Sequence, residues 1–339
     1  MLLPVRILGI EIHLPQHIET LGDMGRENPD WRIDKIFSKS GIKSRHVAAP
    51  GETASDLGLE AARKLLARQL VDPAQIDFLL YCTQSPDHFL PSTACQLQHR
   101  LGLGKRLGAF DFNLGCSGYV YGLAMAKSFI TSGLARNVLL ITADTYTRYI
   151  HPRDRTVRTL FGDGAAATLI GPCPDGQEGI GQFVLGTDGA GFNDLLVPAG
   201  GLRMPRSHHT ATESMDKNGC TRSSENLYMD GKAVFTFSVT EVPETIAQLY
   251  TRTGLKPEQI DWFVYHQASR IILNHLAQRS NVPEEKMVLA FEDIGNTVSA
   301  SIPIAIYRYS QAGKITPGQR LMLVGFGVGY SWGACTVVW

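Results

Sequence analysis

The sequence predicts an α/β protein made of two similar halves, each with a mixed sheet, packed face to face. The first observation behind this prediction is an internal repeat: the segment PAQIDFLLY at 73–81 recurs as PEQIDWFVY at 257–265. Each copy follows a helix-like stretch, at 61–70 and 242–253, and enters an apolar run typical of a strand buried on both faces. Because buried strands need helices to cover them, the repeat indicates two layered α/β units.

Two further matches keep nearly the same spacing and extend the repeat. The apolar run at 138–141 corresponds to the run at 321–324, and the segment at 166–169 corresponds to 334–337. Both halves therefore share one order of strands and helices. The predicted halves are residues 1–170 and 171–339.

Another match includes two residues whose side chains are candidates for catalysis. The segment FNLGCS at 112–117 aligns with EDIGNT at 292–297, which puts Cys116 and Asn296 at equivalent places in the two halves. We expect a pseudo-twofold axis to bring these two side chains close together. The mostly small and apolar residues at 122–132 predict a helix buried almost all round, with Cys116 at its N-terminus.

Length and charge exclude several classes of protein. The chain has 339 residues, enough for a substantial core, so a disulfide-stabilised mini-scaffold is excluded. It carries 32 Lys and Arg against 32 Asp and Glu, a formal net charge of zero. This balance argues against binding to nucleic acid or to a membrane surface through bulk charge.

Cysteine and histidine spacing predicts no metal site. The six cysteines form no CxxC pair, no zinc-type spacing and no disulfide framework, and the pair His208–His209 lies in a polar segment without further ligands nearby. The N-terminus lacks the features of a signal peptide, and no stretch reaches the ~18 apolar residues of a spanning helix. We therefore expect a cytoplasmic protein without a metal or a membrane segment.

Cys116 is the candidate nucleophile. It lies in the segment Gly-Cys-Ser-Gly at 115–118, between an expected strand and the expected buried helix. The dipole and the unpaired N–H groups of a helix N-terminus favour a thiolate and lower a cysteine pKa that starts at ~8.5. We therefore expect a nucleophile suited to thioester carbonyls. The alternative is a small apolar packing residue.

His266 and Asn296 are the candidates for stabilising negative charge. His266 directly follows the expected strand at 262–265, where an α/β sheet delivers functional groups to its cleft, and its counterpart in the repeat is Cys82. A neutral imidazole there can donate a hydrogen bond to an oxyanion or move a proton. An asparagine amide beside it stabilises an enolate without a tight ion pair. The alternatives are a structural histidine and an asparagine that caps the turn after Gly295.

Two glycine-containing segments do not match the nucleotide-binding or hydrolase motifs that they partly resemble. The run GFGVG at 325–329 lacks the full GxGxxG pattern and is followed by a strand-like run at 335–338, so it is better suited to presenting backbone N–H groups toward the site. The segment at 115–118 is one residue short of the G-x-S-x-G elbow of α/β-hydrolases.

A polar segment stands apart from both halves of the repeat. Residues 203–226 are rich in Ser, Thr, His and charged side chains and poor in large apolar ones, which predicts a long surface loop. Whether it forms a lid or a dimer contact is left open.

A set of short motifs occurs in a specific order along essentially the whole chain. They are RHVAAP at 45–50 with Glu52 and Thr53, PSTACQ at 91–96, FGDGA at 161–165, HQA at 266–268, GNT at 295–297 and WG at 332–333. In combination they resemble the β-ketoacyl-acyl-carrier-protein synthase III family of the thiolase superfamily. The resemblance implies a thiolase-like homodimer, in which two pseudo-symmetric halves with mixed five-stranded sheets form a layered α-β-α-β-α core.

The resemblance also implies a catalytic triad of Cys116, His266 and Asn296. In this family an acyl group moves from a coenzyme A thioester onto the cysteine. Malonyl-acyl-carrier protein (malonyl-ACP) then loses carbon dioxide, and its carbanion attacks the acyl-enzyme while the histidine and asparagine hold the enolate oxygen. The backbone N–H groups of Cys116 and of Val328, where the family usually has glycine, would form the oxyanion hole. No metal or redox cofactor is implied, because loss of carbon dioxide drives the reaction.

Five residues are expected to bind substrate by the same resemblance. They are Leu90, Arg155, Phe326, Lys35 and Arg270. Of these, Arg155 matches a family arginine near the coenzyme A entrance.

Three further positions depart from the family pattern. Leu90 replaces an aromatic residue that lines the acyl pocket of the partner subunit. Lys35 stands where typical members stack a tryptophan on the adenine, with Trp31 a turn away, and Ile271 with Arg270 beside it stands where they use an arginine to dock the carrier protein. These departures predict a specialised member of the family rather than the housekeeping initiator of fatty acid synthesis.

The predicted function is therefore decarboxylative Claisen condensation of an acyl-coenzyme A or acyl-ACP primer with malonyl-ACP, giving a 3-oxoacyl-ACP. One alternative is a non-condensing acyltransferase that passes the acyl group to an amine or a hydroxyl. Another is a non-catalytic partner subunit, although such a chain is expected to lack Cys116. A non-decarboxylating thiolase is disfavoured because Cys335 lies inside an expected strand.

Overall fold

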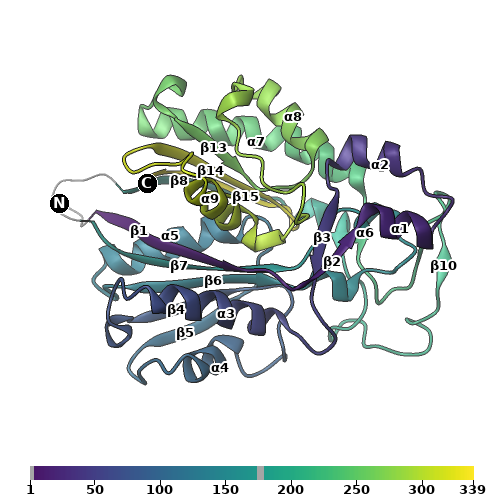
Figure 1. Cartoon of the computed structure of the whole chain (residues 1–339), viewed down its shortest axis with the longest axis horizontal. Helices are drawn as coiled ribbons and strands as arrows, with labels where there is room; N and C mark the ends of the chain where they lie inside the picture. The colour runs from purple at the N-terminus through teal and green to yellow at the C-terminus, as the bar shows by residue number, and fades with distance from the viewer. Residues whose placement is uncertain (1–3, 174–178) are drawn as a thin grey trace.

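The computed structural model describes residues 4–173 and 179–339, and its first half is built on a five-stranded sheet with the order β1-β7-β6-β4-β5 (Figure 1). Its strands are β1 (Val5–His13), β4 (Phe78–Cys82), β5 (Gly108–Phe112), β6 (Val138–Asp144) and β7 (Gly164–Pro172). β4 runs parallel to β5 and β6, whereas β7 runs antiparallel to β6 and β1, so the sheet is mixed as predicted.

The second half has a mixed sheet of four strands in the described part of the chain, in the order β13-β14-β15-β8. Its strands are β8 (Ile180–Thr187), β13 (Trp262–Tyr265), β14 (Arg320–Gly327) and β15 (Ser331–Val338). The expectation of five strands is wrong here. The chain beside β13 makes a single bridge, between Phe263 and Met287, because beyond it the Val288 carbonyl and the Ala290 N–H hydrogen-bond to the side chain of Gln267 instead of to the backbone of a strand.

Strand pairing confirms the repeat predicted from the sequence. β4 pairs with β6 in parallel from Phe78 opposite Val138, and β13 pairs with β14 in parallel from Trp262 opposite Leu321. These are the segments matched by sequence, and they occupy corresponding places in the two sheets.

The match between the last strands of the two halves is wrong by one residue. Leu139 lies opposite Leu169, but its counterpart Met322 lies opposite Thr336 instead of Val337. Both β7 and β15 are buried on both faces along most of their length. An apolar pattern without alternation does not fix a strand register, so the sequence could not resolve this shift.

Helices complete the layers of the fold. The buried helices α5 (Gly118–Thr131) and α9 (Ser301–Gln311) lie between the two sheets and share one core with both (Figure 1). The outer layers are α3 (Ala54–Ala67) and α4 (Thr93–Arg100) on the first sheet, and α7 (Gly231–Thr253) and α8 (Arg270–Arg279) on the second. The layered α-β-α-β-α core is therefore confirmed.

Local sequence signals explain where these helices begin and end. Thr53 caps α3 in a reciprocal capping box with Asp56, so the helix begins at Ala54, seven residues before the expected 61–70. α7 ends before Gly254, which has φ 69° and closes the helix, but it begins 11 residues before the expected 242–253. The buried helix expected at 122–132 is α5, which begins earlier, at Gly118.

The remaining elements gather at one end of the molecule, beside the carboxyl ends of the central strands (Figure 1). They are β2 (His17–Thr20), α1 (Leu21–Glu27), α2 (Ile33–Ser40), β3 (Ser44–Val47), α6 (Arg155–Arg158), β9 (Leu195–Leu196), β10 (Ser214–Met215), β11 (Thr221–Arg222) and β12 (Tyr228–Met229). Short 3₁₀ turns lie at Pro73–Gln75, Tyr146–Tyr149, Gly189–Gly191, Pro257–Gln259, Glu284–Lys286 and Val298–Ala300.

We propose that the halves divide as the repeat suggests, at 1–170 and 171–339. In support, β7 of the first sheet ends at Pro172 and β8 of the second begins at Ile180.

Candidate active site

Cys116 lies in the turn between β5 and α5, at the contact between the two halves. The next residue, Ser117, precedes the first residue of α5, and its hydroxyl hydrogen-bonds to that of Ser331 in the second sheet at 2.7 Å. A Cβ atom on Gly327, at the end of β14, would lie 2.8 Å from the Cys116 sulfur. Only glycine allows this approach, which explains part of the glycine run at 325–329.

The environment of the Cys116 thiol reverses one expectation. Burial and the Asp144 carboxylate together raise the pKa of Cys116 to about 12, against hydrogen bonds from the backbone N–H groups of Cys116 itself and Val328, which lower it. The expected lowering of the pKa is therefore wrong, because loss of hydration outweighs these two backbone hydrogen bonds. The two N–H groups predicted as the oxyanion hole do point at the sulfur.

This pKa predicts how Cys116 reacts with a neutral alkylating agent. Because only the thiolate reacts, carbamidomethylation of Cys116 by iodoacetamide should speed up about tenfold per pH unit from about pH 7 to about pH 10 without a plateau. Peptide mass spectrometry on a Cys95→Ala background, which lacks an exposed thiol, measures the rate. A plateau near neutral pH would show that the thiolate forms in the free protein.

His266 follows β13 directly, as predicted, and is buried. Its Nδ1 lies 2.7 Å from the Ser301 hydroxyl, which also accepts the backbone N–H of Gln267 at 3.4 Å. Burial lowers the pKa of His266 to about 3, so the ring is neutral at physiological pH. Phe326 packs edge-on against it, with ring centroids 5.5 Å apart.

The buried neutral histidine predicts a pH-dependent stability. The pKa of His266 falls from 6.5 unfolded to about 3 folded, so only the unfolded chain carries this proton between those values. Relative to His266→Asn, the wild type should lose about 1.4 kcal/mol of unfolding free energy per unit as pH falls below about 6.5. Urea unfolding of both proteins at equal concentration measures this difference. A difference that does not change with pH would mean that the folded protein takes up the proton.

Asn296 is fixed by backbone contacts on three sides. Its N–H donates to the Leu160 carbonyl at 2.8 Å, its carbonyl accepts the N–H of Gly162 at 3.0 Å, and its Oδ1 accepts the N–H of Val298 at 2.9 Å. Since a backbone N–H can only donate, the amide oxygen must face Val298. The amide nitrogen therefore faces the site, 3.3 Å from Nε2 of His266.

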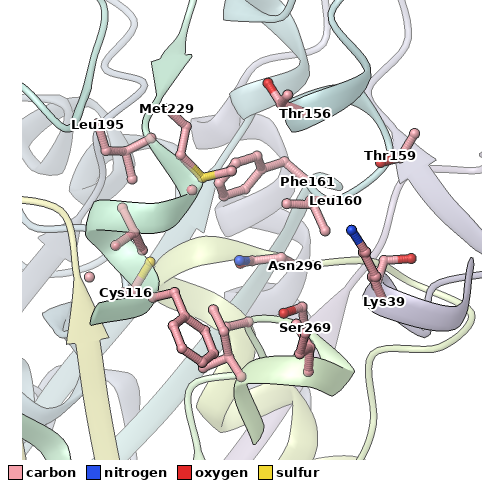
Figure 2. Close-up of a pocket in the computed structure, with 18 of the residues that line it drawn as sticks. Lys39, Cys116, Thr156, Thr159, Leu160, Phe161, Leu195, Met229, Ser269 and Asn296 are labelled. Atoms are coloured by element: carbon pink, nitrogen blue, oxygen red, sulfur yellow. The ribbon is translucent and has the colours of Figure 1, made fainter. Parts of the chain in front are cut away.

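Cys116, His266 and Asn296 all line one cavity of about 360 Å³. In Figure 2, Cys116 lies near Leu195 and Met229 on one side, Lys39 lies on the other, and the Asn296 nitrogen is directed toward the side of Cys116. The other lining side chains are mostly apolar, among them Leu160, Phe161, Val234, Phe235, Ile271 and Ile272. Such a cavity suits an acyl or pantetheine chain.

The structure separates the five expected substrate-binding residues into two groups. Arg155 and Phe326 line the cavity. The other three do not line the cavity. Leu90 is 81% exposed, Lys35 is exposed on α2, and the Arg270 guanidinium lies 5.1 Å from the centroid of the Phe37 ring.

Three residues near the site were not found from the sequence. Lys39 lines the cavity one helical turn after Lys35. Ser301 contacts His266, and Asp144 influences the Cys116 thiol. Lys39 could have been found from the helical spacing of α2, but the other two act through contacts between distant segments.

The polar segment at 203–226 is anchored beside the cavity mouth. Arg222 pairs with the buried Asp154 carboxylate, which caps α6 just before Arg155. Arg155 in turn donates to the carbonyl of Asn218. The segment is thus an extended surface loop, as predicted, and it holds one residue of the cavity in place.

The described residues contain neither a metal-binding cluster nor a membrane-spanning helix. Within 4–173 and 179–339, no group of three or more His, Cys, Asp or Glu side chains is arranged to hold a metal ion. None of the helices described there has both the length and the apolar character needed to span a bilayer.

The doubled α/β fold and the site between its halves define an acyltransferase of the thiolase-like class. Family models described as 3-oxoacyl-[acyl-carrier-protein] synthase III and its C-terminal part match residues 110–189 and 250–339. The chain is also 36% identical, over 98% of its length and 97% of the relative's, to the β-ketoacyl-[acyl-carrier-protein] synthase III of Caldanaerobacter subterraneus subsp. tengcongensis.

Solved structures agree with these matches. A crystal structure of a 3-oxoacyl-(acyl-carrier-protein) synthase III is 49% identical with a TM-score of 0.97, covering 99% of this chain and 100% of that one. The priming β-ketosynthase of the R1128 polyketide pathway is 30% identical with a TM-score of 0.85, covering 99% and 96%. The chain belongs to the 3-oxoacyl-acyl-carrier-protein synthase III family and is an acyltransferase of that type.

Proposed function

We propose that this protein condenses an acyl primer with malonyl-ACP, using Cys116, His266 and Asn296 as catalytic residues. The observation that carries the proposal is that these three side chains meet in one largely apolar cavity of about 360 Å³. Neither a metal nor a redox cofactor takes part in any step.

The first half-reaction loads the enzyme. The sulfur of Cys116 attacks the thioester carbonyl of an acyl-coenzyme A or acyl-ACP donor, a new thioester forms, and the old C–S bond breaks. The thiol proton of Cys116 ends on the released donor thiol. The N–H groups of Cys116 and Val328 stabilise the tetrahedral oxyanion, since both are oriented toward the sulfur.

The second half-reaction forms the carbon–carbon bond. This step uses the tautomer of the neutral ring with its proton on Nε2, in which the Ser301 hydroxyl donates to Nδ1 of His266. Nε2 and the Asn296 amide nitrogen are then two donors, 3.3 Å apart, for the malonyl thioester oxygen. Carbon dioxide leaves, the enolate attacks the acyl carbon, and the Cys116 sulfur departs and is reprotonated.

The rest of the site suggests the class of substrate. The apolar lining suits an acyl chain and pantetheine, and Lys39 and Arg155 supply positive charge for the phosphates of coenzyme A or phosphopantetheine. Lys35 and Arg270 lie outside the cavity, where they could meet only the outer parts of coenzyme A or the carrier protein. Together with Leu90, these departures support a specialised member of the family.

We further propose a homodimer. Phe89 and Leu90 are neighbouring apolar side chains that are 83% and 81% exposed. Large apolar groups exposed together mark an interaction surface. A second copy covering them would bring Leu90 to the acyl pocket of its partner.

Intact-protein mass spectrometry of the wild type tests the function. The protein is incubated with a panel of acyl-coenzyme A and acyl-ACP thioesters, and malonyl-ACP is then added. One class of primer should add its acyl mass, and malonyl-ACP should remove that mass with release of carbon dioxide and a 3-oxoacyl-ACP.

The other outcomes separate the alternatives. Acylation that is discharged by amines or alcohols but not by malonyl-ACP would identify a non-condensing transferase, which the retained Asn296 disfavours. A protein that takes an acyl group from no donor would be the non-catalytic partner subunit.

A further inference from the structure

Asp144 is a buried acidic residue beside the site that the proposed mechanism does not use. It ends β6, at the carboxyl end of a central parallel strand, and it is 0% exposed. Its Oδ1 accepts the backbone N–H of Gln84 at 2.8 Å. Its Oδ2 accepts both the backbone N–H of Ser299, at 3.1 Å, and the Ser299 hydroxyl. One side chain therefore joins the two halves of the molecule at the active site.

The contact between Asp144 and Ser299 fixes the chain segment that orients the Asn296 amide. Val298 lies between them with φ 52°, a conformation that is costly for a β-branched residue. Its N–H nevertheless donates to Oδ1 of Asn296 at 2.9 Å. Strain of this kind persists only where the surroundings impose it. The hydrogen bonds from Ser299 to Asp144 fix the residue after Val298 and so keep this N–H on the Asn296 amide.

The contact with Gln84 supports the turn before Cys116. The Gln84 side chain accepts the hydroxyl of Tyr146 and donates to Oδ1 of Asn113 at 2.9 Å. A Cβ atom on Gly115 would lie 2.5 Å from Oε1 of Gln84, so this side chain packs directly against the turn. Asp144 thus ties the Cys116 turn to the Asn296 segment.

We propose that Asp144 is a positioning residue for the condensation half-reaction, because its carboxylate holds the Asn296 amide toward the malonyl thioester through Ser299 and Val298. This inference rests on the proposed function. A carboxylate is needed because three donors converge on its two oxygens, whereas an amide would turn an NH₂ group toward either Gln84 or Ser299. Burial raises the pKa of Asp144 to about 7, against the hydrogen bonds from Ser299 and Gln84, which lower the pKa and so favour the acceptor form.

The variant Asp144→Asn separates positioning from general structural support. It should slow condensation about 10- to 100-fold in kcat, the effect of a misplaced catalytic group. The acylation rate of Cys116 should not fall, because acylation depends on the N–H groups of Cys116 and Val328, and the carboxylate that is lost is one that raises the pKa of the thiol. In an Asn296→Ala background, Asp144→Asn should cause no further loss, since the group that it positions is gone.

Asp77→Asn is the matched control. Asp77 precedes β4 at the opposite end of the sheet, and its carboxylate accepts the backbone N–H groups of Arg136 and Asn137 at 2.7 and 3.1 Å. The variant Asp77→Asn should catalyse condensation at the wild-type rate. Circular dichroism and thermal unfolding check the fold of each variant. If Asp144→Asn does not fold, Ser299→Ala removes only one of the three donors and should show the same imbalance between half-reactions on a smaller scale.

Two results would overturn the inference while leaving the proposed function intact. One is an equal loss in acylation and condensation. The other is a loss from Asp144→Asn that persists in full without the Asn296 amide. Failure of the proposed function looks different, because the wild type itself would then accept no acyl group.

Discussion

Replacing Cys116 with alanine should abolish the acyl-enzyme and lower condensation at least about 10³-fold, because no other group can form the thioester. The decarboxylation of malonyl-ACP should behave differently. It needs donors at the enolate oxygen, and His266 and Asn296 remain in place when the sulfur is removed. The variant should therefore still release carbon dioxide from malonyl-ACP, now yielding acetyl-ACP instead of a 3-oxoacyl product.

Intact-protein mass and a carbon dioxide assay measure the two activities side by side. Cys95→Ala is the matched control, since it removes an exposed thiol on α4 that is outside the cavity. That variant should be acylated and should condense like the wild type. An acyl adduct that persists in Cys116→Ala would place the nucleophile on another residue. Loss of both activities would mean that the sulfur also organises the decarboxylation site.

Much of this arrangement could be predicted because the halves repeat. The alignment of 112–117 with 292–297 placed Cys116 and Asn296 at equivalent positions, and the structure brings both to one cavity. His266 was predicted from its place after an apolar run, which is β13. Strand ends deliver side chains to a shared edge, so these positions follow from chain order alone.

The features of the site that could not be predicted from the sequence depend on burial and on contacts between distant segments. The pKa of Cys116 is raised because the finished cavity excludes water, a property that a local helix pattern does not contain. Asp144 meets Ser299 across 155 residues, and Ser301 meets His266 across 35. Only the folded chain makes these pairs neighbours.

The lining of the cavity includes a residue that was not selected from the sequence. Alignment by resemblance selected Lys35, and it is Lys39 of the helix α2 that lines the cavity. The two residues lie one turn apart on the same face of the helix, so the position of α2 along its own axis decides which of them lines the cavity.

The variant Asn296→Asp should separate the two half-reactions most sharply. It keeps the shape of the side chain and the oxygen that accepts the Val298 N–H, but it replaces the amide donor beside Nε2 of His266 with a carboxylate oxygen. A negative charge then faces the place where the enolate develops. We expect condensation and malonyl decarboxylation to fall about 10²- to 10³-fold, the usual loss when one donor to an oxyanion is removed.

Acylation of Cys116 should change little in this variant, because its oxyanion is held by backbone N–H groups of Cys116 and Val328. Asn281→Asp provides the same chemical change at an exposed turn after α8, outside the cavity, and it should react like the wild type. Single-turnover acylation and steady-state condensation are measured on the same preparations. The ratio of the acylation rate to the condensation rate then separates the two half-reactions. Because acylation and decarboxylation use different donors, Asn296→Asp should accumulate as the acyl-enzyme in the presence of primer and malonyl-ACP. If acylation falls as far as condensation, the Asn296 amide serves both oxyanions and the assignment of separate donors is wrong.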